Sequence, residues 1–188
     1  MNERRNWLLG GAVVAVLAMA GGVAWRRRQD AGADDPAGTP PPLGDARELL
    51  PPAIDLRGGG QMTAAQWHGR PLVLNFWASW CGPCVKEMPE LDRFARAQAA
   101  RGASGAQVIG LAVDDAPAVD EFLGSHPVSF PISVLGFAGL AWVRKLSNDP
   151  SPALPFSAVF DAQGRLSHRK FGATDFDELT RWTTAGGV

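Results

Sequence analysis

The chain lacks residues and motifs that several functional classes require. Its 188 residues include only two cysteines, which excludes a framework of several disulfides. The formal net charge is −1 and the basic residues are scattered, so nothing favours a nucleic-acid partner. The sequence has no internal repeats and no glycine-rich phosphate loop. Its three histidines, His68, His126 and His168, lie far from one another and from the cysteines, without the spacing of metal ligands.

What the chain does have is one closely spaced pair of cysteines, in the run Trp-Cys-Gly-Pro-Cys at residues 80–84. These two thiols can form one disulfide with each other, and no further cysteine remains to form a stabilising disulfide elsewhere. The pair therefore indicates redox chemistry. The almost wholly apolar run 72–78 before them predicts a strand buried on both faces. After them, apolar residues recur at intervals of three and four and predict a helix.

The expected chemistry follows from the position of Cys81, where the strand turns into the helix. The first turn of a helix has unpaired N–H groups and the positive end of the macrodipole, and both favour a thiolate. We therefore predict that Cys81 is the nucleophile of disulfide exchange and that Cys84, one turn on and facing inward, resolves the mixed disulfide. Pro83 needs no N–H at an early helical position, and Gly82 lets a substrate backbone approach closely.

Other interpretations of this segment stay open. A structural zinc site would need four ligands, and a passive buried pair would have no chemistry. Lys86 and Glu87 are expected on a solvated helix face rather than in the site. Trp77 and Trp80 are expected to pack around the disulfide, with Trp80 partly exposed as a docking surface; simple core packing is the alternative.

A resemblance to a known family is carried by residues 76–84, which read Phe-Trp-Ala-Ser-Trp-Cys-Gly-Pro-Cys, with Pro89 eight residues after Cys81. This segment resembles the active site of the thioredoxin superfamily. The runs 74–77 and 87–91 are closest to the TlpA/ResA-like membrane-anchored thiol–disulfide oxidoreductases, which include cytochrome c maturation factors. The resemblance covers about residues 53–188. It implies a thioredoxin-like α/β fold with no cofactor besides the redox-active disulfide.

The remaining elements fit that fold on their own pattern. Residues 54–63 read as a hairpin around a glycine turn, 107–113 as a second buried strand and 117–124 as a short helix. Residues 156–171 read as an antiparallel hairpin, and Asp175 as the cap of a closing helix. This order predicts a mixed central sheet flanked by helices.

Pro155 stands directly before the predicted hairpin, after Leu154. The resemblance implies that the peptide bond before this proline is cis and that the proline faces the two cysteines. It also implies that Leu154 offers its backbone groups to a bound peptide. An ordinary trans proline at the entrance of a strand is the alternative. The predicted substrate-binding residues are Trp80, Gly82, Pro83, Leu154 and Pro155.

Asn75 departs from the thioredoxin pattern. Six residues before the first active-site cysteine, classical thioredoxins carry a buried acid that exchanges a proton with the second cysteine, and an amide cannot do so. TlpA/ResA-like proteins often place an acid after the next buried strand, which here means Asp114 or Asp115. We predict that Asp115 is the proton partner of Cys84. Ordinary capping of the following helix is the alternative role.

The N-terminus bears on location. Residues 7–25 contain no charge, are flanked by arginines and are nearly long enough to span a bilayer, so we expect a single-pass anchor after a cytoplasmic segment 1–6. The three arginines of 26–28 favour a cytoplasmic C-terminal domain by the positive-inside rule, whereas the resemblance implies a periplasmic one on the bacterial inner membrane. A loose twin-arginine pattern at 4–9 favours export, and 18–20 would suit cleavage by signal peptidase. Residues 26–52, with six prolines and no aromatic residue, are predicted to be a tether.

The sequence thus predicts a membrane-tethered, monomeric thiol–disulfide oxidoreductase with its catalytic domain at 53–188. The Gly-Pro dipeptide between the cysteines is that of thioredoxin, and this resemblance favours a reductase. The expected substrates are protein thiols and disulfides, and the expected electron donor is a membrane thiol carrier. Cytochrome c maturation is one expected setting. A thiol peroxidase on the same fold and a binding module for metal or substrate are the alternatives.

Overall fold

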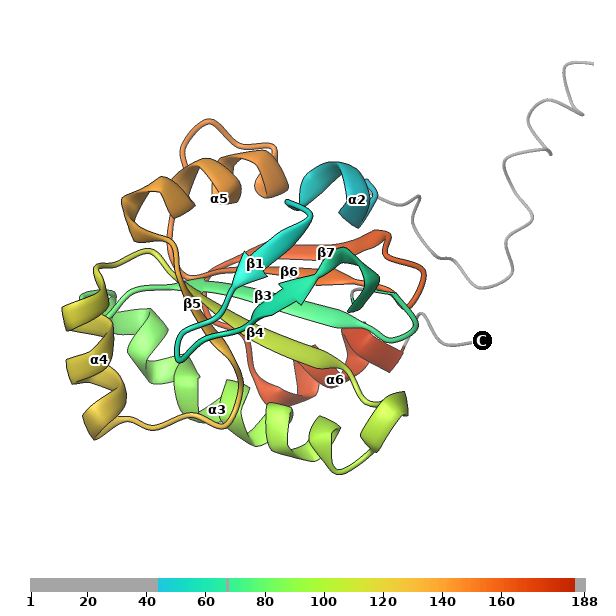
Figure 1. Cartoon of the computed structure of the whole chain (residues 1–188), viewed down its shortest axis with the longest axis horizontal. Helices are drawn as coiled ribbons and strands as arrows, with labels where there is room; N and C mark the ends of the chain where they lie inside the picture. Colours follow the sequence, from blue (N-terminus) through green and yellow to red (C-terminus); the bar gives the residue numbers. More distant parts are fainter. Residues whose placement is uncertain (1–43, 67, 185–188) are drawn as a thin grey trace, which may run out of the picture. The chain divides into compact units, whose positions relative to one another are not determined.

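The structure, a computed structural model, describes residues 44–66 and 68–184 (Figure 1). The predicted anchor 7–25 and most of the predicted tether lie outside these residues. Within the part of the chain that is described, no helix is both long enough and apolar enough to cross a bilayer.

A mixed sheet with the strand order β5-β4-β3-β6-β7 forms the centre of the fold. Its middle strand, β3 (Leu72–Trp77), is buried at every position, as its apolar sequence predicts. On one side β4 (Gln107–Ala112) runs parallel to β3, and β5 (Ile132–Val134) runs parallel to β4. On the other side β6 (Phe156–Phe160) is antiparallel to β3, and β7 (Leu166–Phe171) is antiparallel to β6.

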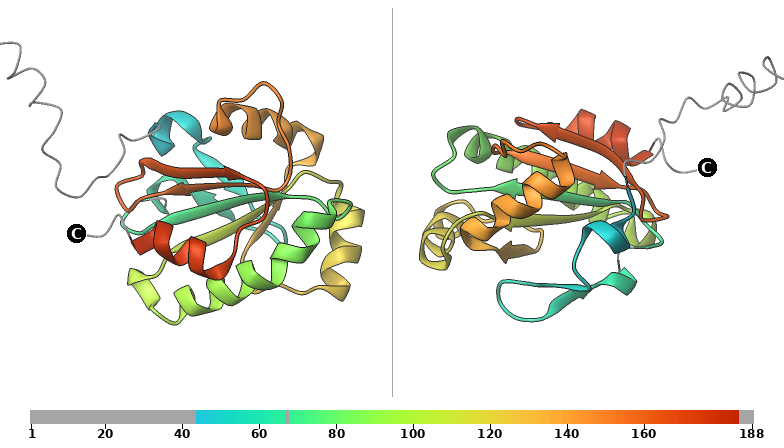
Figure 2. Two further views of the ribbon diagram at one scale, coloured as in Figure 1. Left: turned by 180° about the vertical axis from the view of Figure 1, so that it is seen from behind. Right: turned by 90° about the horizontal axis from the view of Figure 1, so that it is seen from above.

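One face of the sheet is covered by α3 (Gly82–Ala99), α4 (Ala116–Ser125) and α6 (Phe176–Thr184). Figures 1 and 2 show α3 and α6 side by side on this face. Successive side chains of a strand point to opposite faces, so β3 directs Val73 and Trp77 to this layer, where both cysteines also pack.

The opposite face is covered by the N-terminal elements of the described chain and by one later helix. These are α2 (Ala46–Leu49), the hairpin of β1 (Ala53–Asp55) and β2 (Gln61–Thr63), and α5 (Gly139–Ser147). Leu72, Leu74 and Phe76 of β3 are fully buried against them, and burial of each such side chain contributes about 1.5–3 kcal/mol. Short 3₁₀ turns at Ala64–Gln66, Gly102–Ser104 and Gly136–Ala138 complete the described elements.

The elements expected from sequence are present, with small shifts at their ends. The glycine-turn hairpin, the second buried strand and the antiparallel hairpin form as β1–β2, β4 and β6–β7. The closing helix α6 is capped as predicted, because the Asp175 carboxylate accepts a hydrogen bond of 2.8 Å from the backbone N–H of Glu178.

Residues before the predicted start of the domain at 53 also pack onto the fold. Ala46 and Leu50 are buried in the second core layer, and the backbone N–H of Ala46 donates to the carbonyl of Gly164 over 2.7 Å. Asp45 and Arg165 also form an isolated antiparallel bridge. The folded part therefore includes residues 44–52, whose alanine and leucine side chains fill a gap beside β7 despite the prolines around them.

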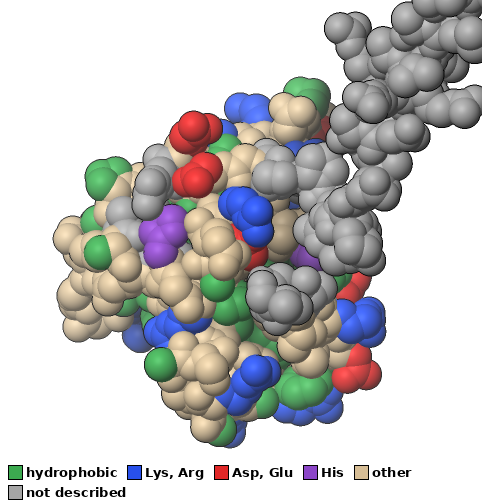
Figure 3. Space-filling view, turned by 90° about the vertical axis from the view of Figure 1, so that its right-hand side faces the viewer, with side chains coloured by type: hydrophobic (Ala, Val, Ile, Leu, Met, Phe, Trp, Pro, Cys, Tyr) green, Lys and Arg blue, Asp and Glu red, His purple; other side chains and the backbone are tan. Residues whose placement is uncertain are grey.

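Charge is mixed on the surface. On the face drawn in Figure 3, lysine and arginine side chains are interspersed with aspartate and glutamate among polar and apolar groups. This pattern agrees with the scattered charges of the sequence.

Candidate active site

The two cysteines form a disulfide where β3 passes into α3. The Sγ atoms of Cys81 and Cys84 are 2.01 Å apart. Cys81 is the N-cap residue of α3, and its sulfur accepts a hydrogen bond of 3.3 Å from the backbone N–H of Cys84. The sulfur of the first cysteine thus lies among the unpaired N–H groups of the helix, the position that stabilises a thiolate.

The two sulfurs differ in access. Cys84 is fully buried, whereas Cys81 is 6% exposed and is followed by the exposed residues Gly82 and Pro83. Trp80, directly before Cys81, is 59% exposed. The predicted inward position of Cys84 and the predicted exposure of Trp80 are confirmed. A partner disulfide would meet Cys81 first, across the turn formed by these exposed residues.

A buried carboxylate holds the turn that leads to Cys81. Asp114, at the end of β4, is 4% exposed, and its Oδ2 accepts hydrogen bonds from the backbone N–H (2.9 Å) and the hydroxyl (2.7 Å) of Ser79. Since β3 and β4 are parallel neighbours, their C-terminal ends meet at one edge, and Asp114 reaches across it. The sequence pointed to the Asp-Asp pair but not to this role of its first member.

Asp115 occupies the capping position that was its alternative role. It is exposed, and its carboxylate accepts a hydrogen bond of 2.9 Å from the backbone N–H of Ala118 in the first turn of α4. The described contacts join it to α4 and not to Cys84. Its role as a proton partner stays a prediction.

The Leu154–Pro155 peptide bond is cis, as the resemblance implied. Pro155 is buried directly before β6, and its carbonyl accepts a hydrogen bond of 2.9 Å from the N–H of Gly172. Leu154 packs against the core layer that contains both cysteines. Because β6 is antiparallel to β3, the start of β6 lies at the same sheet edge as the disulfide.

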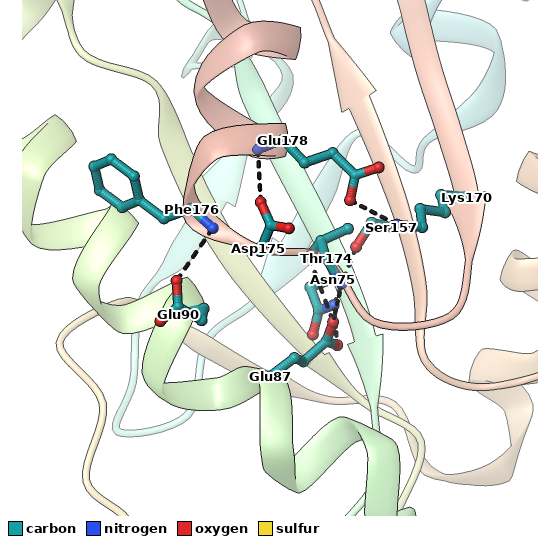
Figure 4. Close-up of polar contacts among 9 residues, drawn as sticks. All are labelled: Asn75, Glu87, Glu90, Ser157, Lys170, Thr174, Asp175, Phe176 and Glu178. Carbon is teal, nitrogen blue, oxygen red and sulfur yellow. Dashed lines mark hydrogen bonds and ion pairs between the residues drawn. The ribbon is translucent and has the colours of Figure 1, made fainter.

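Glu87 is not on a solvated face, so that prediction is wrong. Its side chain is 2% exposed and lies between α3, β3 and the connection from β7 to α6 (Figure 4). Its Oε1 accepts a hydrogen bond of 2.8 Å from Nδ2 of Asn75, and its Oε2 accepts one of 2.8 Å from the backbone N–H of Thr174. Glu87 follows Cys84 by three residues, which places the two on one face of the helix. Lys86 is exposed, as expected.

Burial changes the acidity of this carboxyl group. Desolvation raises the pKa of Glu87 from 4.5 to about 7, against the lowering effect of hydrogen bonds from Thr174 and Asn75 and of the charge on Lys170. A group with a pKa near neutrality can both take and give a proton at physiological pH. Glu87 is therefore a buried carboxyl group, three residues after Cys84 on α3, with a pKa near neutrality.

A second set of contacts fastens α6 to the same place. Lys170 of β7 forms an ion pair of 2.6 Å with Glu178 of α6, and Glu90 accepts a hydrogen bond of 3.3 Å from the backbone N–H of Phe176 (Figure 4). These bonds hold the β7–α6 connection over α3, which is what keeps Glu87 away from water.

The comparison with known families decides the assignment. The Redoxin family matches residues 44–181, which include the disulfide, the cis proline and Glu87. The chain belongs to the Redoxin family.

Known relatives of this Redoxin protein are thiol–disulfide oxidoreductases. Sporulation thiol-disulfide oxidoreductase A of Bacillus subtilis is 27% identical over 116 residues, 61% of this chain and 67% of that protein. Thiol-disulfide oxidoreductase ResA of Bacillus thuringiensis subsp. konkukian is 30% identical over 125 residues, 66% of this chain and 68% of that protein. The alignments thus span about two thirds of these curated relatives.

Solved structures agree on the fold. A secreted Mycobacterium tuberculosis disulfide oxidoreductase, described as homologous to E. coli DsbE, matches with a TM-score of 0.58 and 26% identity, over 74% of this chain and 99% of that one. StoA from Bacillus subtilis matches in fold, with a TM-score of 0.56 and 22% identity over 70% of this chain and 94% of that one. Together with the Cys81–Cys84 disulfide, the relatives identify a ResA/StoA-like thiol–disulfide oxidoreductase.

Exposed apolar residues gather at the active edge of the Redoxin sheet. The exposed large hydrophobic residues of the described chain are Trp80, Phe137 and Phe171. Trp80 follows β3 and Phe137 follows β5, so both lie beyond the C-terminal ends of parallel strands. Phe171 ends β7 and pairs with Phe156 at the start of β6. All three therefore lie along the edge that carries the disulfide.

Other features of the Redoxin domain lie apart from the sulfur atoms. A hollow of about 480 Å³ between α3 and the α4–β5 connection begins at Val85, but neither cysteine lines it. Within residues 44–66 and 68–184, no group of three or more histidine, cysteine, aspartate or glutamate side chains is arranged to hold a metal ion.

Proposed function

We propose that this chain is a membrane-tethered disulfide reductase whose Redoxin domain faces the periplasm and acts, as a monomer, on exported proteins. The observation that carries the proposal is the disulfide at the start of α3, with the Cys81 sulfur accepting a helix N–H and Cys84 buried behind it. The Gly-Pro dipeptide between the cysteines supports reduction, and the uncharged segment 7–25 supports the tether. The proposed clients include the cysteine pairs of apocytochromes c, and a membrane thiol carrier supplies electrons.

The proposed reaction consists of two exchanges. In the reduced protein the Cys81 thiolate attacks one sulfur of a client disulfide, a mixed disulfide forms, and the other client sulfur leaves as a thiolate that takes a proton. The Cys84 thiolate then attacks the Cys81 sulfur and releases the second client sulfur as a thiolate. The client gains two electrons, and this protein ends as the disulfide seen in the structure.

Glu87 is the proposed proton partner in the second exchange. Cys84 must lose its proton before it can attack, and it lies in the core beyond the reach of bulk water. Glu87, three residues on along the same helix face and with a pKa of about 7, can accept that proton. Asp115 is the competing candidate from the sequence. Glu87→Gln is expected to flatten the pH dependence of the second exchange around neutrality, whereas Asp115→Asn leaves it unchanged; the reverse result would restore Asp115.

Client docking is proposed along the apolar edge. An extended client segment that crosses Trp80, Gly82 and Pro83 would reach the Cys81 sulfur and the backbone of Leu154 before the cis proline. Aromatic side chains give a large contact area that does not depend on one client sequence. Such a surface suits a reductase with several clients.

Covalent trapping tests the proposed reaction. Cys84→Ala leaves the mixed disulfide on Cys81 unresolved, so the reduced full-length variant is expected to accumulate a covalent adduct with a peptide that contains a disulfide. The matched variant Cys81→Ala removes the more accessible of the two cysteines and is expected to form none. Equal adduct on both variants, or none on Cys84→Ala, would contradict the assignment of the nucleophile.

A further inference from the structure

The buried amide of Asn75 has an uneven set of hydrogen bonds. Its side chain is fully buried in β3, and its Nδ2 donates to Oε1 of Glu87 (2.8 Å) and to the hydroxyl of Ser157 (3.1 Å). Its Oδ1 is buried and has no hydrogen-bond partner among the described residues. Both bonded oxygens thus lie on the nitrogen side of the amide (Figure 4).

This arrangement suits only one protonation state of Glu87. An ionised carboxylate accepts hydrogen bonds and donates none, so Nδ2 must face it. A protonated carboxyl group has an O–H that needs an acceptor, and the Ser157 hydroxyl can either donate or accept. The backbone N–H of Thr174 donates to Oε2 over 2.8 Å, and the Thr174 hydroxyl lies 3.4 Å from the same oxygen. Oε1 has the shorter side-chain contact, 2.8 Å from the Asn75 amide, so we place the proton of the neutral acid on Oε1.

An amide can serve both states by turning over. The oxygen and nitrogen ends of asparagine are nearly alike in shape, and a half-turn about the terminal torsion exchanges them. After that turn Oδ1 faces two donors, the Glu87 O–H and the Ser157 O–H. An amide orientation thus exists for each protonation state of Glu87.

We propose that Asn75 is a positioning residue that reverses its amide when Glu87 gains or loses a proton, and so holds the Glu87 carboxyl between Asn75 and Thr174 in both states. The importance of this movement for catalysis rests on the proposed role of Glu87 as proton partner. An acid at position 75 could not do the same. Two carboxyl groups within hydrogen-bond distance share one proton and titrate as a pair.

The charged groups around Glu87 are the same before and after the turn. They come from each element packed against it: Glu90 on its own helix, Lys170 on β7, Asp175 before α6, and Glu178 on α6 in its ion pair with Lys170. The β3 and β6 neighbours, Asn75 and Ser157, carry no charge. A change in Glu87 titration on replacement of Asn75 therefore reports on the amide.

The decisive experiment is an NMR titration of the oxidised full-length chain, with ¹³C in the glutamate carboxyl groups and ¹⁵N in the asparagine amides. The Asn75 side-chain NH₂ signals are expected to shift with the same midpoint as the Glu87 carboxyl signal. Asn75→Leu is expected to raise the Glu87 pKa by about one unit, through loss of one hydrogen bond to the charged form. Asn75→Asp is expected to give two coupled protonation steps, shared by Glu87 and the new carboxyl group at position 75. The exposed Asn148→Asp variant is the control and leaves the titration unchanged.

Two results would overturn the proposal. One is a wild-type titration in which the Asn75 NH₂ signals do not respond to Glu87, a test that needs no variant to fold. The other is an unchanged Glu87 pKa in both Asn75 variants. The midpoint potential of the disulfide against pH is measured alongside. Suppose that the Asn75 amide and the Glu87 carboxyl group titrate with one midpoint while the midpoint potential shows no change of pH dependence at the Glu87 pKa. In that case the amide reversal is supported and the proton-partner role of Glu87 is refuted.

Discussion

The burial of Glu87 should make the stability of this protein fall as the pH rises toward neutrality. The pKa of this carboxyl group is 4.5 in the unfolded chain and about 7 in the fold, because burial disfavours its charged form. That difference corresponds to about 3 kcal/mol, a large part of the stability of an ordinary domain. The side chain is 2% exposed, so water screens its charge little.

The direction follows from proton binding. Below pH 4.5 Glu87 is protonated in both the folded and the unfolded state, so it does not lower the free energy of unfolding. Between pH 4.5 and about 7 the folded protein holds a proton that the unfolded chain has released, so the free energy of unfolding falls as the pH rises. Above about pH 7 both states are ionised, and the full loss is reached.

Glu87→Gln removes the charge and keeps the shape. Its carbonyl can accept from the backbone N–H of Thr174, and its NH₂ can donate to the Asn75 amide once that amide has turned. We expect wild type and variant to have similar stabilities near pH 4.5. At pH 8 the variant should be more stable by about 3 kcal/mol, a rise in Tm on the order of 10 °C.

The assay is denaturant unfolding of the oxidised protein, followed by tryptophan fluorescence at intervals from pH 4 to pH 9. The exposed Glu121→Gln variant serves as the control, since its carboxylate is solvated in both states and its profile should follow wild type. Parallel profiles for wild type and Glu87→Gln across this range would refute the argument that an ionised buried carboxylate weakens the fold.

Two further predictions concern the turn around Cys81. In Asp114, Oδ2 accepts hydrogen bonds from Ser79 and Oδ1 accepts one from the backbone N–H of Asp115. Asp114→Asn replaces one of these oxygens by an NH₂ group, so the free energy of unfolding should fall by about 1–3 kcal/mol. The matched Asp115→Asn variant keeps a good helix cap and should lose much less; equal losses would argue against a special role of the buried acid. Trp80→Ala should slow reduction of a disulfide-containing peptide severalfold and leave reduction of a small aromatic disulfide nearly unchanged. An equal effect on both substrates would place Trp80 in the chemistry of Cys81 rather than in docking.

Patterns within one segment of the chain were sufficient to predict the sheet and the sulfur pair. The strand at 72–77 is apolar except for Asn75, and an almost wholly apolar run is typical of a strand buried on both faces. The cysteine spacing and the start of a helix fix the geometry of the disulfide locally. The strand β5 and the helix α5 were not predicted, because β5 has only three residues and prolines and glycines surround both elements.

Features that depend on contacts between distant segments were missed. The prolines of 26–52 suggested a tether, yet Ala46 and Leu50 are buried in the core layer that also contains Val143 of α5 and Leu166 of β7. Glu87 was assigned to solvent because it is charged. Its spacing from Cys84 and from Leu91, three and four residues, is that of the buried stripe and was the available signal. The cover over this stripe comes from residues near Thr174, and no pattern within α3 predicts it.

The departure at Asn75 acquires a meaning in this context. An amide on β3, where thioredoxins carry an acid, suggested that the buried carboxyl had been lost or moved to the end of the next strand. The structure has a buried carboxyl in contact with that same amide, but it comes from the facing helix. The distance between an acid on the strand and the second cysteine on the helix depends on how the helix packs against the sheet. Glu87 shares one rigid helix with Cys84, so their separation is set by helix geometry. An oxidoreductase built this way can vary its sheet packing while the thiol and its proposed proton partner stay matched.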